Sequence, residues 1–189
     1  MEDIAADTGL KKASLYYYFP TKEELFQAVV ERKHQDFADR VEQILSGSNT
    51  AAEKLESYVS ARFDYFKKLQ SLNMVDFRSI ARNMTLLRGM FRRYARKELD
   101  WLCQVFELGN ENGEFELQSI EKTGQAFLHI MQGLRLRFMR AHSDQAPNPA
   151  AFAQHRREIM FVTQIFLRGI RAEIRENKRM PISKSKLKS

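Results

Sequence analysis

Residues 2–24 read EDIAADTGLKKASLYYYFPTKEE, and this stretch decides how the N-terminal part of the chain folds. Residues 3–8 predict a short helix, and Gly9 then permits a left-handed turn that a residue with a Cβ would resist. A second short helix is predicted over residues 13–19. Pro20 ends it, because proline cannot continue a helix.

A third helix is predicted directly afterwards. Thr21 and Glu24 have the spacing of a capping box, in which each residue satisfies a backbone N–H of the other. A helix, a tight turn and a second helix carrying lysine and tyrosine form the layout of a helix-turn-helix, whose second helix enters the major groove of DNA.

The stretch resembles the DNA-binding domain of the TetR family of bacterial transcriptional repressors. The resemblance rests on residues at fixed offsets without a gap: Ile4, Ala5, Gly9, Leu15, Tyr16, Tyr18, Phe19, Lys22 and Leu25. It implies double-stranded DNA as a partner and places these residues near base edges or phosphates: Lys11, Lys12, Ala13, Ser14, Tyr16, Tyr17, Tyr18 and Lys22. Tyrosine hydroxyls can donate to phosphate oxygens, and a lysine at a helix N-terminus reinforces the helix dipole.

In the family a further helix packs across these two, and Met1 stands where the second of the family's helices would start. We therefore expect residues 1–45 to hold an incomplete helix-turn-helix domain, lacking its first helix, together with a connecting helix. This leaves an alternative open, in which the protein is a small-molecule-binding helical dimer that does not read DNA in this form.

The composition favours an all-α fold. The 189 residues include only 8 glycines and 4 prolines, and hydrophobic residues make up 43% of the chain, enough for a substantial core. The net charge of +7 is compatible with a nucleic-acid partner. Cys103 is the single cysteine, which excludes an internal disulfide and fits a reducing cytoplasm. No apolar run is long enough to span a membrane, so no membrane partner is expected.

Capping residues, glycine and proline mark where the remaining helices are predicted to begin and end. They are expected over residues 21–45, from 50 onward, near 74–82, and over 86–112, 119–142 and 149–175. In the family's terms, residues 46–176 form an effector-binding and dimerisation domain, and 177–189 form a basic, disordered tail.

The resemblance implies a pocket for a small-molecule effector among the middle helices. Aromatic and methionine side chains there suggest an apolar or aromatic ligand. The candidate residues are Phe63, Phe66, Met74, Phe77, Met90, Phe91, Tyr94, Trp101 and His129. For each residue taken singly, ordinary core packing is the competing interpretation.

A run of basic residues lies within this region without any acidic residue. It consists of Arg78, Arg82, Arg88, Arg92, Arg93, Arg96 and Lys97. The run is interpreted either as a solvated surface that attracts DNA or as the entrance for an anionic ligand.

The last two helices are expected to form a homodimer through a four-helix bundle, which would pair two helix-turn-helix units on a palindrome. The candidate contacts are Leu134, Phe138, Phe161, Ile165 and Arg168, with packing inside one chain as the alternative. No metal-ligand spacing, nucleophile motif or phosphate loop appears, so no cofactor, metal or enzymatic activity is expected. The expected function is a regulator, most commonly a repressor, released from its operator by an effector.

Overall fold

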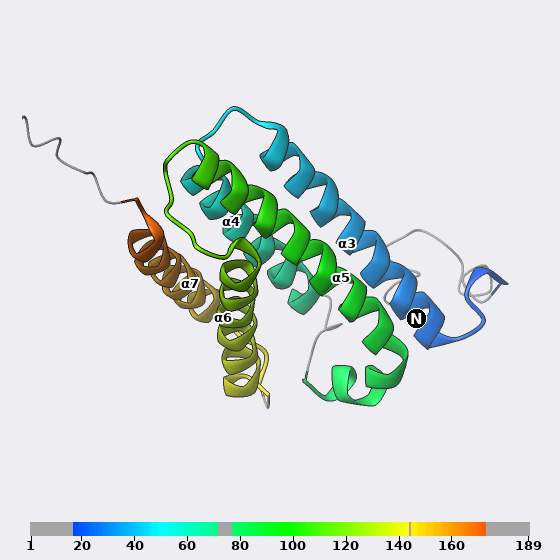
Figure 1. The fold of residues 1–189 in the computed structure, drawn as a ribbon. Helices are drawn as coiled ribbons and strands as arrows, with labels where there is room; N and C mark the ends of the chain where they lie inside the picture. Colours follow the sequence, from blue (N-terminus) through cyan, green and yellow to red (C-terminus); the bar gives the residue numbers. More distant parts are fainter. Residues whose placement is uncertain (1–16, 72–76, 144, 173–189) are drawn as a thin grey trace, which may run out of the picture.

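The computed structural model describes residues 17–71, 77–143 and 145–172, and within them the fold is all-α, as predicted (Figure 1). A single isolated β-bridge in these ranges joins Phe115 to Arg171. The helices are α3 (Lys22–Ser46), α4 (Ala51–Ser71), α5 (Phe77–Glu111), α6 (Ile120–Ala141) and α7 (Pro149–Ile170).

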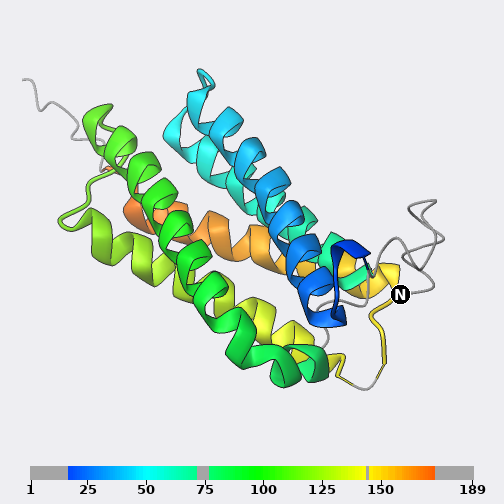
Figure 2. The ribbon, with the colours of Figure 1, turned by 90° about the vertical axis from the view of Figure 1, so that its right-hand side faces the viewer.

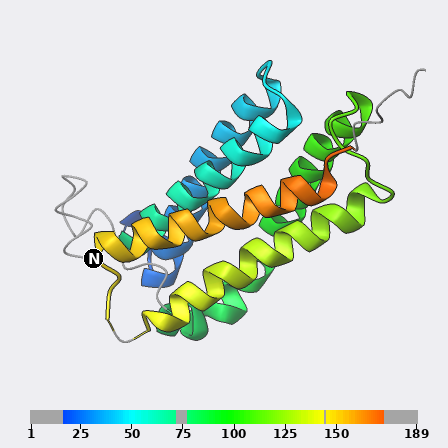
Figure 3. The same cartoon turned by 90° about the vertical axis from the view of Figure 1, so that its left-hand side faces the viewer.

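The helices pack around α4, which contacts α3, α5 and α7. The long helices α3 and α5 lie side by side on one side of the molecule (Figures 1 and 2). Helices α6 and α7 lie together on the opposite side, where they form one continuous face (Figure 3). The backbones of α4 and α6 stay apart within the described ranges, so side chains fill the space between these two helices.

Capping residues start the helices where the sequence predicts. The Thr21 hydroxyl accepts a hydrogen bond from the Glu24 backbone N–H at 3.1 Å, and the Glu24 carboxylate accepts from the Thr21 N–H at 3.4 Å. Thr50 and Glu53 form the same reciprocal pair at the start of α4. Asn148 caps α7 by accepting from the Ala151 N–H at 2.8 Å.

Two predicted boundaries are wrong. The short helix near 74–82 and the long helix over 86–112 are one helix, α5, because no glycine or proline interrupts residues 82–86. The last helix ends at Ile170 instead of near residue 175. There, the Ile170 carbonyl accepts from the Glu116 N–H at 3.1 Å, and Arg171 is extended and pairs with Phe115.

The turn after α5 makes hydrogen bonds to α5 itself, to the start of α4 and to the end of α7. Gly113 has a φ of 72°, which glycine adopts without strain. The chain then folds back, so that the Phe115 N–H donates to the Gly109 carbonyl at 3.0 Å. The Glu114 carboxylate accepts from the backbone N–H groups of Ala51 and Ala52, at the positive end of the α4 dipole.

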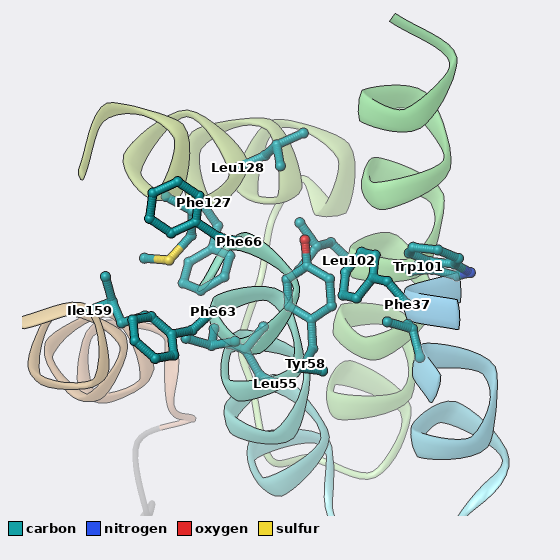
Figure 4. Packing of buried hydrophobic residues seen from close by; sticks show 14 of the residues in the cluster. Phe37, Leu55, Tyr58, Phe63, Phe66, Trp101, Leu102, Phe127, Leu128 and Ile159 are labelled. Atoms are coloured by element: carbon teal, nitrogen blue, oxygen red, sulfur yellow. The ribbon is translucent and has the colours of Figure 1, made fainter. Parts of the chain in front are cut away.

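The hydrophobic core extends along α4 in two directions (Figure 4). Tyr58 lies toward Phe37 and Trp101, on the side of α3 and α5, whereas Phe63 lies toward Ile159 of α7. Helix α4 therefore separates an aromatic layer against α3 from a second layer against α6 and α7.

A buried lysine fastens α4 to the end of α3. The Lys54 side chain is only 3% exposed, and its Nζ donates to the backbone carbonyls of Ile44, Leu45 and Gly47. The last carbonyls of a helix have no partner within the helix, and they carry the negative end of its dipole. One ammonium group thus satisfies several otherwise unpaired acceptors.

Replacing Lys54 by methionine, which keeps the length of the side chain, is expected to lower the free energy of unfolding by about 1–3 kcal/mol, because buried carbonyls lose a charged donor. Lys122→Met is the control, since Lys122 is exposed on α6 and its replacement should change stability by less than about 0.5 kcal/mol. Urea unfolding measures both variants. Equal stabilities would show that Lys54 does not hold the end of α3.

Candidate functional site

The predicted DNA-contact residues are only partly within the described ranges. Lys11, Lys12, Ala13, Ser14 and Tyr16 lie outside them, as does the side chain of Lys22. Tyr17 and Tyr18 are described, with exposures of 82% and 69%, and their rings meet edge to face at 5.2 Å. Neither tyrosine is part of the core, so both rings and hydroxyls are free to contact a partner.

Further along α3, its aromatic side chains pack in a layer with aromatic side chains of α4 and α5. The His34 ring stacks on Tyr94 with a centroid distance of 3.4 Å, and Phe37 stacks on Tyr65 at 5.1 Å. Burial lowers the pKa of His34 to about 4, and neither ring nitrogen has a hydrogen-bond partner among the described residues. His34 is therefore neutral at neutral pH and acts as a packing residue between α3 and α5.

A buried polar cluster lies beside this layer. Glu98 of α5 accepts at one oxygen from the Tyr58 hydroxyl at 2.7 Å and from Arg62 Nε at 2.6 Å, both on α4. The Arg62 and Glu98 side chains are 11% and 12% exposed. Burial by itself raises the pKa of a carboxyl, but the charge of Arg62 and the two hydrogen bonds outweigh it and hold the pKa of Glu98 below its usual value.

Arg135 of α6 adds a second guanidinium to this cluster. It makes no hydrogen bond or ion pair with any residue in the described part of the chain. Burial and the neighbouring charge of Arg62 both lower the pKa of Arg135, while Glu98 acts in the opposite direction. A single carboxylate thus faces two guanidinium groups.

Both arginines line a small cavity where α4, α6 and α7 converge. Its volume is about 20 Å³, roughly the space of one water molecule. Its remaining lining is mostly apolar: Val59, Phe63, Phe66, Met131, His155 and Ile159. Pockets that hold small-molecule ligands usually measure about 300–1,000 Å³, so a ligand here requires the side chains to move apart.

The predicted effector residues separate into several groups. Phe63 and Phe66 line the cavity. Trp101 and Tyr94 instead belong to the aromatic layer against α3, with Met90 buried and Phe91 half-buried in the same core. His129 is exposed on α6 and lines none of the described cavities. Met74 and the side chain of Phe77 lie outside the described residues.

The residues of the basic run also lie in different surroundings. The side chains of Arg78, Arg82 and Arg88 are not among those described, whereas Arg92, Arg93 and Arg96 are exposed. Lys97 pairs with Glu42 of α3 at 3.1 Å and lies over the Trp101 ring. The four described members line none of the cavities formed by described residues, and Lys97 and Arg93 instead link α5 to α3.

Comparisons with known proteins agree with the helix-turn-helix interpretation. Residues 1–29 match the model of the family described as "Bacterial regulatory proteins, tetR family". The chain is 25% identical over 113 residues to the "Fatty acid metabolism regulator protein" of Bacillus subtilis (strain 168), covering 60% of this chain and 58% of that protein. It is 23% identical over 125 residues to the "HTH-type transcriptional regulator QacR" of Staphylococcus aureus, covering 65% of this chain and 66% of that protein.

The similarity to solved structures extends over most of the chain. A transcriptional regulator from Cytophaga hutchinsonii superposes with a TM-score of 0.81 and 27% identity, covering 91% of this chain and 88% of that one. Residues 1–29 thus match the tetR family of bacterial regulatory proteins, and the fold of the chain is similar to that of a transcriptional regulator. The fold is also shared with the ketosteroid transcriptional regulator KstR2 of Mycobacterium tuberculosis, at a TM-score of 0.61 and 18% identity over 90% of this chain and 84% of that one.

Helices α6 and α7 lie side by side (Figure 3), and they carry exposed apolar side chains. Phe161 is 66% exposed and Ile165 is 53% exposed, with Leu134 half-buried and Arg168 exposed beside them on the same two helices. Phe138 differs from the other predicted dimer residues. It is buried inside the chain, where its ring stacks on His155 at 4.4 Å.

The sequence interpretation missed the polar cluster, although the sequence contains a signal for it. Arg62, Glu98 and Arg135 each occupy a position on the apolar stripe of their own helix. Glu98 lies four residues after Tyr94, and Arg135 lies three residues before the buried Phe138. A charged residue at core spacing indicates a buried, paired or ligand-binding group.

No described helix is both long and apolar enough to cross a bilayer. The described ranges also contain no cluster of residues suited to hold a metal ion.

Proposed function

We propose that the protein is a cytoplasmic, ligand-responsive repressor that binds a palindromic operator as a homodimer and is released by a small apolar or aromatic effector. Residues 1–45 would supply the helix-turn-helix and connecting helix, residues 46–176 the effector site and dimer contacts, and residues 177–189 a basic tail. The Bacillus subtilis relative is named a regulator of fatty acid metabolism, and fatty acids carry long apolar chains.

The position of α4 carries this proposal. On one side, Tyr65 and Tyr58 pack against Phe37 of α3, the helix that leads directly from Tyr17 and Tyr18. On the other side, Arg62 and the phenylalanines of α4 line the cavity. A ligand that enlarges the cavity would press on α4, and α3 is fastened to α4 by packing and by Lys54.

The effector then acts by shifting a population between two states. It can favour the state with displaced helix-turn-helix units only through its higher affinity for that state. Two-fold symmetry would place the two recognition helices about 34–36 Å apart, so a small rotation of α3 would move them out of register with successive major grooves.

Binding to DNA from beside the protein's own gene tests the proposal. A gel shift at near-physiological salt should show one discrete complex, and Tyr17→Ala should weaken it about tenfold because an exposed contact to the DNA is lost. Arg140→Ala is the control, since Arg140 is exposed on α6, far along the chain from the helix-turn-helix.

The assay is run with this chain and with a version extended upstream in frame. A discrete complex with either version supports the proposed function. Failure of both to bind specifically would contradict it and favour a ligand-binding dimer that does not read DNA.

The face of α6 and α7 supports the homodimer. Apolar side chains as exposed as Phe161 and Ile165 on one face usually mark a protein interface. Gly133 and Gly169 lie on the same two helices, and a Cβ built on either would meet no described atom within 4 Å, so a second copy could approach closely there.

Replacing Ile165 by glutamate is expected to convert the dimer to a monomer, because a buried unpaired charge at an interface is costly. Size-exclusion chromatography with light scattering measures the mass in solution. Gln154→Glu adds a charge at an exposed position of the same helix and should leave the dimer intact. A dimer that persists in Ile165→Glu would place the interface elsewhere.

A further inference from the structure

The charges around the cavity do not balance. Arg62 and Arg135 are cationic and Glu98 is the only carboxylate that the described structure hydrogen-bonds to either of them. Tyr58 also donates to Glu98, so the cluster contains one carboxylate and more N–H and O–H donors than it has acceptors. Among the described residues, one positive charge is left without a counter-ion in a partly buried site, where an uncompensated charge is costly.

The N–H donors of the two arginines also outnumber the acceptors near them. A guanidinium group has five N–H donors. Arg62 uses its Nε on Glu98 and also interacts with the Tyr58 hydroxyl, whereas the donors of Arg135 have no partner among the described residues. Two guanidinium groups that face one cavity are suited to a planar, bidentate acceptor.

We propose that Arg135, assisted by Arg62, binds the carboxylate of an amphipathic effector whose apolar body lies among Phe63, Phe66, Met131 and Ile159. The inference rests on the proposed effector site and adds the chemical class of the ligand, a monocarboxylic acid with an apolar chain or ring. A single negative charge would neutralise the one excess positive charge of the cluster.

The same arrangement explains how such a ligand would act. The cavity holds about one water molecule in this state, so an apolar body enters only if Phe66 and Met131 change conformation. The head group would remain anchored between α4 and α6, whose backbones are not in contact in the described ranges. Binding therefore separates or rotates α4, the helix that packs against α3.

Isothermal titration calorimetry with dodecanoate and dodecan-1-ol tests the proposal on the full chain. The two probes share an apolar chain and differ in the charged head. The unmodified protein is expected to bind dodecanoate at least tenfold more tightly than the alcohol. Arg135→Met should remove at least tenfold of the dodecanoate affinity and leave the alcohol unaffected, and Arg135→Lys should recover only part of the loss, since lysine lacks the planar fork.

Arg137→Met is the matched control, because Arg137 lies two residues further along α6, is exposed, and pairs with Glu158 instead of facing the cavity. It should bind both probes as the unmodified protein does. Thermal unfolding of each variant shows that it is folded under the conditions of the titration.

Equal affinity for the acid and the alcohol, absence of binding by both, or an unchanged dodecanoate affinity in Arg135→Met would each overturn the carboxylate site. The gel shift with promoter DNA is run on the same samples. Specific DNA binding together with failure of the titration overturns the ligand class alone, whereas loss of specific DNA binding contradicts the proposed function.

Discussion

Glu98→Gln is expected to lower the free energy of unfolding by about 3–5 kcal/mol at neutral pH, the largest effect of any substitution considered for this protein. Glutamine retains the shape of the side chain and can still accept from Tyr58, but it removes the one negative charge that the described residues place beside Arg62 and Arg135. The buried guanidinium of Arg62 and the half-buried one of Arg135 would then remain without compensation. Urea or guanidinium unfolding at pH 7 measures the difference.

The pH dependence of this difference identifies the ionised carboxylate as its cause. The pKa of Glu98 lies below its ordinary value of 4.5 in the folded protein, so its contribution to stability is present above pH 4.5. As the pH falls through the folded pKa, the carboxylate is protonated and the contribution is lost. The gap between the unmodified protein and Glu98→Gln should therefore be largest at pH 7 and shrink below pH 4.5.

A paired substitution separates charge from packing. Arg62→Met combined with Glu98→Gln removes one charge of each sign, and it should be less destabilised than Glu98→Gln alone because fewer buried charges are left uncompensated. If the double variant were less stable than Glu98→Gln, packing by the Arg62 side chain would be the more important contribution. A gap between Glu98→Gln and the unmodified protein that does not change with pH would contradict the role of the charge.

Gly109→Ala is expected to lower the free energy of unfolding by about 2–3 kcal/mol, although alanine normally stabilises a helix relative to glycine. A Cβ built on Gly109 overlaps the ring of Phe115, which is 3% exposed and packs edge to face on Phe106. The ring cannot simply move aside, because the Phe115 N–H is bonded to the Gly109 carbonyl and its backbone pairs with Arg171.

Gly89 provides a control of opposite sign on the same helix. It is exposed, and a Cβ there would meet only the end of the Arg93 side chain, at 4.0 Å. Gly89→Ala should therefore raise the free energy of unfolding by about 0.5–1 kcal/mol. Thermal or urea unfolding of both variants checks the pair, and a stabilised Gly109→Ala would show that the Phe115 turn is not closely packed.

Most helix starts, and two of the helix ends, were predictable from the sequence because the interactions that set them are local. Thr21 and Thr50 each pair with a glutamate three residues later, and Asn148 caps the next turn of its own helix. The end of α5 before Gly113 follows from the conformational freedom of one residue. These features depend on neighbours within a few positions, so the pattern of residues is sufficient to indicate them.

The errors occurred where distant segments decide the outcome. The last helix stops at Ile170 because Arg171 pairs with Phe115, more than fifty residues earlier in the chain. Phe138 was predicted at the dimer surface from its place on an apolar stripe, but a stripe does not reveal which of two packing surfaces it meets. In the structure Phe138 packs against Phe66 and His155 within the same chain.

The candidate effector site shows most clearly the difference between what local sequence determines and what the packing of distant segments determines. Residues 2–24 were sufficient to indicate the similarity to the tetR family, because a helix-turn-helix is a short, continuous unit with residues at fixed offsets. The Arg62, Glu98 and Arg135 cluster comes from three different helices, and no local pattern specifies that one carboxylate will face two guanidinium groups. Each helix by itself shows only that a charge occupies a core position. The packing of α4 and α6 against α5 then determines which charges share a site, and so which ligand chemistry the site favours.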